Sequence, residues 1–350
     1  MEEHTEQCME ENVEDLLVNG GAFCCSKLRR INKMSELKYT AADLKEMQAW
    51  SLERKIQVTQ TRIIEWYQKF NGQVYVSFSG GKDSTVLLDI ARRLYPDIQA
   101  AFCDTGLEYP EIREFVKTKE NVVWLKPKMN FRKVIETYGY PLISKEVAQK
   151  IHEARLCPTG FVSARFDPNS TYNQKYKQRY SMAKWKWLRD SNVPISHYCC
   201  NVMKKRPAKS FEKASGLHPI VATMAVESRL RATKWKQYGC NTFDTKRPIS
   251  QPMSFWTEQD VLLYIHRYNL PYCSVYGNIV EDEKGHLTTT GCDRTGCVFC
   301  GFGCHLEKEP NRFQRLKKTH PKLWEYCMKP WSEGGLGMRE VLEYIGVKVE

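Results

Sequence analysis

One short segment constrains the fold of this chain more than any other part of it. Residues 73–78 alternate in polarity, two adjacent glycines follow shortly after, and an apolar run then covers 85–91. This order predicts a strand, a tight turn and a helix. Gly80 and Gly81 let the backbone turn sharply and approach a ligand closely. Because the new helix directs unpaired N–H groups and its positive dipole end at the turn, the segment predicts an α/β unit that binds phosphate or another tetrahedral oxyanion.

The side chains of this turn suit the same anionic ligand. Ser79 and Ser84 contribute hydroxyl donors, and Lys82 contributes a mobile positive charge. The turn does not follow the Walker pattern, which needs four residues between its first glycine and Gly-Lys-Ser/Thr. A glycine pair ahead of a helix is by itself equally typical of a structural turn, so the assignment depends on the motifs around it.

Two strings together resemble a known superfamily. Residues 79–84, Ser-Gly-Gly-Lys-Asp-Ser, resemble the PP-loop of the ATP pyrophosphatases, which cleave ATP between its α and β phosphates or bind a related adenylyl sulfate. Residues 104–111, Asp-Thr-Gly-Leu-Glu-Tyr-Pro-Glu, are similar to the second signature of the phosphoadenosine phosphosulfate (PAPS) reductase-like branch. The resemblance implies an adenine-nucleotide site that draws on both strings: Ser79, Gly80, Gly81, Lys82, Asp83, Ser84, Asp104, Thr105 and Gly106. Taken alone, the second string is a β–α turn in which Asp104 caps a helix.

Strands and helices alternate around these strings. Between residues 73 and 139 the pattern predicts strands that end near Phe78, Cys103 and Leu125, each followed by a helix. We therefore expect an α/β fold with a doubly wound parallel sheet, adenine nucleotide α-hydrolase-like by resemblance, whose ligands bind beyond the carboxyl ends of the strands. The expected parts are an acidic tail (1–33), a helical lead-in (34–70), a nucleotide-binding domain (71–250) and a Cys-rich helical region (251–350).

A third element follows a strand expected at 219–224. Residues 227–231, Glu-Ser-Arg-Leu-Arg, resemble the family's Glu-Ser-x-x-Arg element. The resemblance implies that Glu227, Ser228, Arg229 and Arg231 bind the anionic end of the nucleotide, and planar guanidinium groups suit bidentate phosphate contacts. Relatives carry Gly and Arg upstream, where this chain has Ala222 and Met224. One anion-binding arginine is therefore missing or is replaced by Arg229.

The segment 252–277 resembles the family's P-x-x-x-W … Y-x-G segment, and the role that this resemblance implies is mostly structural. Thr257, with Asp260 three residues later, predicts a helix start with a capping box.

Fourteen cysteines favour metal binding or thiol chemistry over disulfides in a chain that shows no secretion signal. Cys199-Cys200 with Lys204, followed by Cys297-x-x-Cys300, resembles the adenylyl-sulfate reductases that carry a [4Fe–4S] cluster. Lys204 would then help to hold an anionic ligand near the cluster. Four thiolates suit such a cluster or a structural zinc.

A local alternative uses the four cysteines that lie within thirteen residues: Cys292, Cys297, Cys300 and Cys304. We favour the set of Cys199, Cys200, Cys297 and Cys300, because the spacing of Lys204 matches the family too. A third interpretation leaves these cysteines buried and without a ligand.

The nucleophile of the reductases has no counterpart by motif. PAPS and adenylyl-sulfate (APS) reductases end in Glu-Cys-Gly-Leu-His, whose cysteine attacks the sulfonucleotide sulfur and is later released by thioredoxin. The 350 residues contain no such string, and Cys273, Cys304 and Cys327 do not match it. This weakens the case for sulfonucleotide reduction and leaves nucleotide binding intact.

Charge and composition point to an anionic partner. The net charge of +12 suits a nucleotide or a nucleic acid. Residues 172–189 interleave bases with aromatics and contain no acid, a pattern that can follow a phosphate backbone and stack on bases; the alternative is an amphipathic helix with a solvated basic face. No run of about 18 apolar residues or signal peptide is visible, so we expect no membrane span and a cytoplasmic location.

Three functions follow. The first is ATP-dependent sulfur transfer to DNA or tRNA, in which Lys82 stabilises departing pyrophosphate, Asp83 or Asp104 holds Mg²⁺, and an Fe–S site helps sulfur from a donor to replace an adenylated oxygen. The second is APS or PAPS reduction with a thioredoxin-like reductant, which releases sulfite. The third is a non-enzymatic nucleotide-sensing subunit, against which the intact loop at 79–84 argues.

Overall fold

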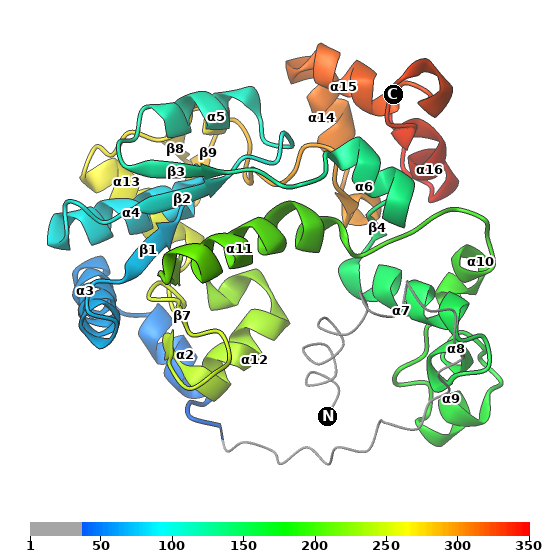
Figure 1. The fold of residues 1–350 in the computed structure, drawn as a ribbon, viewed down its shortest axis with the longest axis horizontal. Coiled ribbons are helices and arrows are strands. Elements are labelled where there is room, and N and C mark those ends of the chain that lie inside the picture. Colours follow the sequence, from blue (N-terminus) through cyan, green and yellow to red (C-terminus); the bar gives the residue numbers. More distant parts are fainter. Residues whose placement is uncertain (1–36) are drawn as a thin grey trace. The chain divides into compact units, whose positions relative to one another are not determined.

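The computed structural model describes residues 37–350, of which residues 38–350 form one compact unit (Figure 1). The expected acidic tail, 1–33, and the start of the lead-in, 34–36, lie outside the described residues. A six-stranded sheet has the order β3-β2-β1-β5-β7-β6. Its strands are β1 Val74–Ser77, β2 Ala100–Cys103, β3 Val122–Leu125, β5 His218–Val221, β6 Asn241–Thr242 and β7 Ile249–Ser250.

The sheet is doubly wound, as predicted. Its neighbouring strands are parallel except for β6 and β7, which pair antiparallel. The central residue Val76 of β1 pairs with Ala100 on one side and with Ile220 on the other. The chain winds outward from β1 in one direction through β2 and β3, and reaches the other side only at β5. The carboxyl ends of β1 and β5 therefore form a topological switch point, where ligands of such sheets bind.

Helices cover both faces of this sheet and close its core. The predicted lead-in forms two helices, and Pro110 lies in the first turn of α5, where the missing N–H of proline is tolerated. These helices are α2 Ala41–Gln48, α3 Leu52–Lys69, α4 Lys82–Leu94, α5 Pro110–Lys117, α11 Arg206–Ser215, α12 Arg229–Tyr238 and α13 Glu258–Arg267. The helix α6 Phe131–Tyr138 follows β3 and lies beside the sheet rather than on it (Figure 1). The capping box of α13 is confirmed, since the Thr257 hydroxyl accepts from the Asp260 amide at 3.4 Å and the Asp260 carboxylate accepts from the Thr257 amide at 2.7 Å.

The remaining elements include the helices of a second region next to the sheet. Its helices are α7 Lys145–Leu156, α8 Phe161–Ala164, α9 Thr171–Lys175, α10 Lys186–Arg189, α14 Arg312–Thr319, α15 Pro321–Met328 and α16 Met338–Tyr344. β4 Leu142–Ile143 pairs parallel with β10 Gly301–Phe302, and β8 Ile279–Glu281 pairs antiparallel with β9 Leu287–Thr289. Short 3₁₀ helices are η1 Ala183–Trp185, η3 Ala225–Glu227, η4 Ser274–Tyr276, η5 Cys304–Leu306 and η6 Trp331–Glu333, and η2 Asn201–Lys205 is a π-helix.

Two hydrophobic clusters stabilise these regions. One surrounds the sheet and includes Val76, Phe102 and Trp256, and the other includes Ile143, Leu188 and Phe299. Both clusters draw on residues before and after position 250, and the division into 71–250 and 251–350 stays a prediction. None of the helices within residues 37–350 combines the length and the apolar character that crossing a membrane requires.

Candidate functional site

The turn between β1 and α4 is fixed by its own side chains. The Ser84 hydroxyl donates to the Gly81 carbonyl at 3.0 Å and accepts from the Ser79 amide at 3.1 Å. Gly80 has φ +71°, and a Cβ there would lie 2.8 Å from the Ile112 side chain. Only glycine satisfies both the left-handed backbone and this close packing. The turn is therefore held by its own hydroxyls and by packing against α5.

Lys82 is anchored at the first residue of α4 rather than mobile. Its side chain is only 5% exposed, and Nζ contacts a Glu258 carboxylate oxygen at 2.8 Å and donates to the Asp293 carbonyl at 2.6 Å. The Lys82 amide donates to the Tyr276 hydroxyl at 3.2 Å, and that hydroxyl lies 2.7 Å from the Thr295 hydroxyl. Residues from three distant segments thus hold the backbone and the ammonium group of Lys82 at the mouth of the turn.

A cavity of about 530 Å³ opens beyond the carboxyl ends of β1 and β5. This volume is typical of small-molecule sites, and the place is the switch point of the sheet. The lining combines the turn, the segment after β5, the start of α13 and a loop before Cys297: Ser79, Gly81, Lys82, Asp83, Met224, Val226, Glu227, Thr257, Glu258, Gln259, Tyr276, Arg294, Thr295 and Gly296.

Charges of both signs surround this cavity. Burial raises the pKa of the Asp83 carboxyl, although Lys82, Arg294 and Arg231 oppose that rise. The Asp83 Oδ1 atom is buried and has no hydrogen-bond partner. Burial also lowers the pKa of Arg231, and nearby Arg294 lowers it further. An anion bound here would therefore relieve repulsion between two arginines, and a cation would satisfy Asp83.

Some residues of the Glu-Ser-Arg-Leu-Arg element lie at the cavity, and others begin helix α12. Glu227 lines the cavity and forms an ion pair with Arg231. Ser228 caps α12, because its hydroxyl accepts from the Arg231 amide at 3.2 Å. Arg229 is exposed at the start of that helix. Glu227 thus lines the cavity and Arg231 lies beside it, and the binding role that the resemblance implies for both stays a prediction.

The turn at 104–106 lies outside the residues that line the cavity. Asp104 pairs with Arg113 at 3.0 Å through Oδ2, while its Oδ1 is buried without a partner. Asp104 does not cap a helix, since α5 starts at Pro110 after the N-cap Tyr109. The Thr105 hydroxyl donates to Glu108 at 2.7 Å, and Gly106 supplies a left-handed residue with φ +71°.

This turn instead adjoins the predicted cysteine set. The Val298 amide donates to the Leu107 carbonyl at 2.8 Å, which docks the Cys297–Cys300 loop against the turn. The Cys103 thiol contacts the Lys204 carbonyl at 3.7 Å. Nearby Cys297 and Glu108 raise the pKa of Lys204 above its ordinary value although burial opposes this. Lys204 therefore links the turn to the cysteines.

The structure brings Cys199, Cys200, Cys297 and Cys300 into one electrostatic group. Burial raises the pKa of Cys199, and the other three thiols raise it further. Burial and Cys297 together raise the pKa of Cys300 to about 11. Lys204 opposes the rise of the Cys297 pKa that burial causes. Lys204 belongs to the π-helix η2, which begins directly after Cys200, and π-helical turns often occur at functional sites.

The alternates Cys292 and Cys304 have other surroundings. Burial raises the pKa of Cys292, and its neighbours include Tyr109 and Arg315. The buried Cys304 thiol donates to the Gly301 carbonyl at 2.9 Å. Among residues 37–350 no group of three or more His, Cys, Asp or Glu side chains stands in metal-binding geometry. Four thiols and a lysine fit a thiolate-bound metal by chemistry, and the thiols would have to turn toward one another to bind one.

Several cavity residues have no counterpart in the sequence prediction. Glu258 and Tyr276 lie in the segment to which the resemblance assigns a structural role, and Arg294 and Thr295 follow a cysteine. The polar, glycine-bounded string at 291–296 was the available signal, because such strings form loops that can approach a ligand. Its placement beside Lys82 depends on contacts between residues roughly two hundred positions apart.

Comparisons with known proteins find several similar proteins. A family model described as the phosphoadenosine phosphosulfate reductase domain matches residues 73–159 and 162–302. Two uncharacterized proteins of Methanocaldococcus jannaschii are 28% and 25% identical over 74% and 83% of this chain, and the chain spans about half of their length, 41% and 55%. The adenosine 5'-phosphosulfate reductase of Staphylococcus haemolyticus is 26% identical over 66% of this chain and 73% of its own.

A solved structure is also similar. The PAPS reductase of Candida auris, in a phosphate complex, superimposes with a TM-score of 0.37 at 13% identity, over 71% of this chain and 97% of its own.

Proposed function

The chain belongs to the phosphoadenosine phosphosulfate reductase domain family, and we propose that it is an enzyme that cleaves ATP in this cavity and transfers sulfur to a nucleic acid. Family membership and the named reductase relatives support an enzyme with a sulfonucleotide reductase-type or related function. The observation that carries the ATP proposal is the cavity at the switch point, which Lys82 and Arg294 line and near which Arg231 acts on Asp83.

Each group of the cavity has a role in this reaction. The amides at the start of α4 and Lys82 would stabilise the charge that develops on departing pyrophosphate. Arg231 and Arg294 would bind further phosphate oxygens, because planar guanidinium groups match them bidentately. The unpartnered Asp83 Oδ1 would ligate Mg²⁺, and the ion would supply charge neutralisation on the phosphates. Nucleotide binding would replace Glu258 as the partner of Lys82.

The cysteine set provides the second half of the proposal. Cys199, Cys200, Cys297 and Cys300 would hold a [4Fe–4S] cluster, or zinc as the alternative. A cluster there would supply a site for sulfur or electron transfer. Lys204 lies between these thiols and Glu108 of the neighbouring turn, so it would keep a positive charge on the boundary between the cysteines and the nucleotide.

APS or PAPS reduction is the alternative, and the named relatives favour it. The lysine among the cysteines also suits an anionic sulfonucleotide. In that reaction a thioredoxin-like protein would supply the reducing thiol and sulfite would be released.

One experiment separates these functions. The protein, prepared without oxygen, is incubated with Mg²⁺, α-³²P-ATP and sulfide as the sulfur donor, with and without single-stranded DNA or tRNA, and AMP and pyrophosphate are measured. In parallel it receives APS or PAPS with reduced thioredoxin, and sulfite is measured. We expect AMP and pyrophosphate in the first arm. Sulfite without pyrophosphate would replace the proposal with the reductase, and neither product would favour a nucleotide-sensing subunit.

A further inference from the structure

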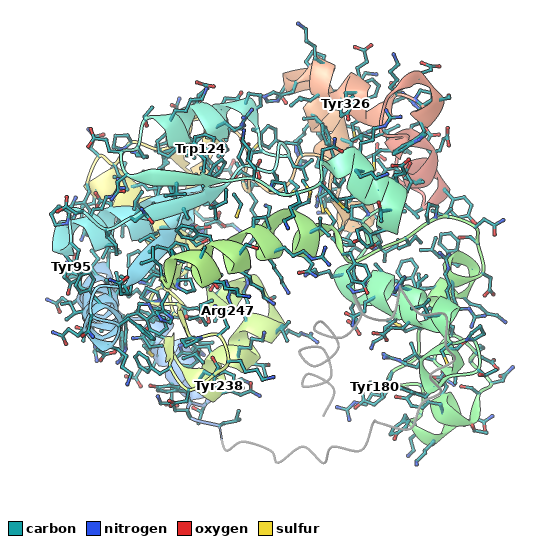
Figure 2. All side chains as sticks on the ribbon, in the orientation of Figure 1. Tyr95, Trp124, Tyr180, Tyr238, Arg247 and Tyr326 are labelled. Carbon is teal, nitrogen blue, oxygen red and sulfur yellow. The ribbon has the colours of Figure 1, made fainter. Side chains whose placement is uncertain are left out.

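A basic and aromatic surface covers the α8–α10 side of the molecule. In Figure 1 these helices lie at the lower right, apart from the central sheet, and Figure 2 labels Tyr180 there. We define the basic-aromatic surface by its exposed side chains: Lys175, Tyr176, Lys177, Arg179, Lys184, Lys186 and Trp187. Tyr176 and Trp187 are 41% and 44% exposed. Both large rings therefore reach solvent.

The segment beneath this surface is rigidly held. Buried Asn173 donates to the carbonyl of Asp167 at 2.7 Å and to that of Arg165 at 3.1 Å. Arg165 in turn donates to the Tyr180 carbonyl at 2.8 Å. Buried Met182 and Leu188 anchor the same segment in the second hydrophobic cluster. Polar groups inside thus fix the backbone, and the basic side chains remain on the outside.

The segment is not a solvated amphipathic helix. It consists of the short helices α9, η1 and α10, which left-handed residues Lys177 and Gln178 interrupt after α9. Ring centroids of Tyr172 and Tyr176 lie 4.7 Å apart, and those of Tyr176 and Tyr180 lie 5.7 Å apart. A row of rings therefore follows the surface, which the solvated-helix alternative does not explain.

Lys175, Arg179 and Lys184 of this surface stand beside aromatic rings, and no acid within residues 37–350 pairs with the surface cations. Lys184 Nζ lies 4.9 Å from the Trp185 ring centroid, and the Arg179 guanidinium lies 5.6 Å from that of Tyr180. The nearest ion pairs are Arg165 with Glu146 and Arg189 with Asp190. None of the five exposed cations forms an ion pair with a residue of the described range 37–350. Their charge is available to an external anion.

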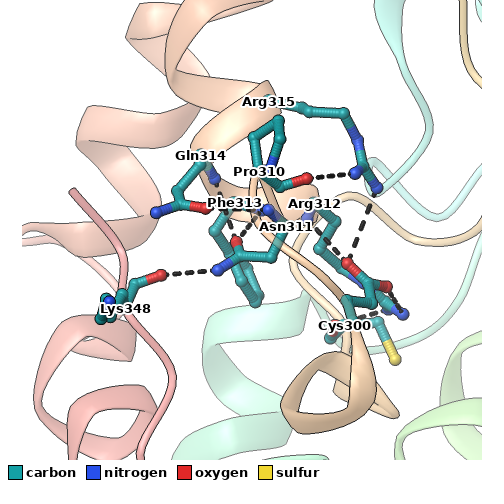
Figure 3. A network of polar contacts seen from close by, with 9 residues as sticks. Cys300, Pro310, Asn311, Arg312, Phe313, Gln314, Arg315 and Lys348 are labelled. Carbon is teal, nitrogen blue, oxygen red and sulfur yellow. Dashed lines mark hydrogen bonds and ion pairs between the residues drawn. The ribbon is translucent and has the colours of Figure 1, made fainter.

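The surface continues toward the loop that carries Cys300. The Trp185 and His305 rings lie 5.6 Å apart. His305 belongs to η5, four residues after β10 begins and five after Cys300. Figure 3 shows the other flank of this loop, where Arg312 donates to the Cys300 carbonyl at 3.0 Å. A ligand that reaches Trp185 would thus lie beside the short helix that follows the Cys297–Cys300 loop.

We propose that the basic-aromatic surface binds single-stranded nucleic acid. Phosphates lie along Lys177, Arg179 and Lys184, and unpaired bases stack on Tyr176 and Trp187. Stacking needs bases that are free of a duplex, whereas a purely basic patch binds duplex equally well. The inference rests on the proposed function for the reaction that follows binding, but binding itself requires no ATP.

The test is fluorescence anisotropy without nucleotide, using the full-length protein and labelled 20-mers of single-stranded DNA, single-stranded RNA and duplex DNA. The triple variant Lys177→Ala, Arg179→Ala, Lys184→Ala should bind the single strands at least tenfold more weakly. Its slope of log affinity against log salt should fall by about 2, since each phosphate contact on a single strand contributes about 0.7. The control triple Lys318→Ala, Lys322→Ala, Lys329→Ala removes equal charge from exposed positions of α14, α15 and the residue after it, and should bind as wild type.

A second variant isolates stacking. Tyr176→Ala with Trp187→Ala should weaken single-strand binding about tenfold or more and leave the salt slope unchanged. Duplex binding as tight as single-strand binding, or equal losses in the two charge triples, would overturn the proposal. Circular dichroism and thermal unfolding verify that each variant is folded. Pyrophosphate release from ATP in the presence of single-stranded nucleic acid is measured alongside. If it is absent while the binding pattern holds, only the proposed function fails, and if it is present while the triple variant binds normally, only this inference fails.

Discussion

Gly80 and Gly106 form a matched pair for testing how the nucleotide turn is held. Both have φ +71°. A Cβ at Gly80 would lie 2.8 Å from an Ile112 methyl and 2.9 Å from a Val116 methyl, whereas a Cβ at Gly106 meets nothing within 4 Å. The substitutions Gly80→Ala and Gly106→Ala therefore introduce the same backbone strain and differ in steric contact.

The expected magnitudes follow from these two contributions. A left-handed backbone costs an ordinary residue about 1–2 kcal/mol, which is the whole expected loss for Gly106→Ala. Gly80→Ala adds overpacking against α5, typically about 1–3 kcal/mol. We therefore expect Gly80→Ala to lose about 2–5 kcal/mol of unfolding free energy, and to displace the turn because the Ile112 and Val116 side chains are buried.

The assay is equilibrium denaturation in urea, followed by tryptophan fluorescence and circular dichroism, with midpoints compared at a common slope. Affinity for ATP is measured on the same preparations by isothermal titration calorimetry. Gly80→Ala should lose both stability and affinity, and Gly106→Ala should lose stability alone. Equal stability losses for the two variants would refute the conclusion that contact with α5 fixes the turn.

Three further outcomes are expected. Lys82→Ala should lower the rate of pyrophosphate release about 10²–10³-fold with the fold intact by circular dichroism, and turnover within twofold of wild type would show that this lysine does not serve catalysis. Glu258→Gln removes the carboxylate partner of Lys82 and should bind ATP more tightly. Burial raises the pKa of the folded Asp83 carboxyl above 3.8, so the folded state binds this proton more tightly than the unfolded state does. The wild type therefore loses unfolding free energy as the pH rises above that value. Urea titrations from pH 4 to 7 should show that Asp83→Asn gains stability relative to the wild type with rising pH, and parallel curves for the two proteins would contradict this. Cys297→Ser should remove iron from anaerobically purified protein, measured by metal and sulfide analysis, whereas Cys157→Ser, at an exposed cysteine, should retain it; zinc without iron in the wild type would replace the cluster with a structural zinc.

The local elements of this fold could be predicted from the sequence because their signals are short-range. The strands and helices from 74 to 138 follow hydrophobic periodicity and glycine turns, and they occur where the pattern places them. The capping box at Thr257 and Asp260 needs only four residues. The resemblance assigned one region to the cysteine set and its lysine: Cys199, Cys200, Lys204, Cys297 and Cys300. In the structure these side chains lie close enough to shift one another's pKa values.

The partners of the cavity could not be predicted, since they depend on long-range packing. Lys82 meets Glu258 and the Asp293 carbonyl across intervals of 176 and 211 residues, and no periodicity reports such contacts. The same holds for the turn at 104–106, which the strand order places beside the cysteines and outside the cavity lining. The shapes of short irregular segments such as α8–α10 depend on buried amides and guanidinium groups, whose partners are backbone carbonyls that any sequence provides.

The loop from Asp293 to Cys300 has contacts of different kinds at its two ends. Its first residues depend on Lys82 and Tyr276, and its Val298 amide is tied to the turn after β2. A phosphate that captures Lys82 would release the Asp293 carbonyl and leave the Val298 tether in place. A ligand in the cavity would thus loosen the first residues of a segment that ends in Cys297 and Cys300. The cavity and the cysteine set would then be coupled through the backbone of this loop.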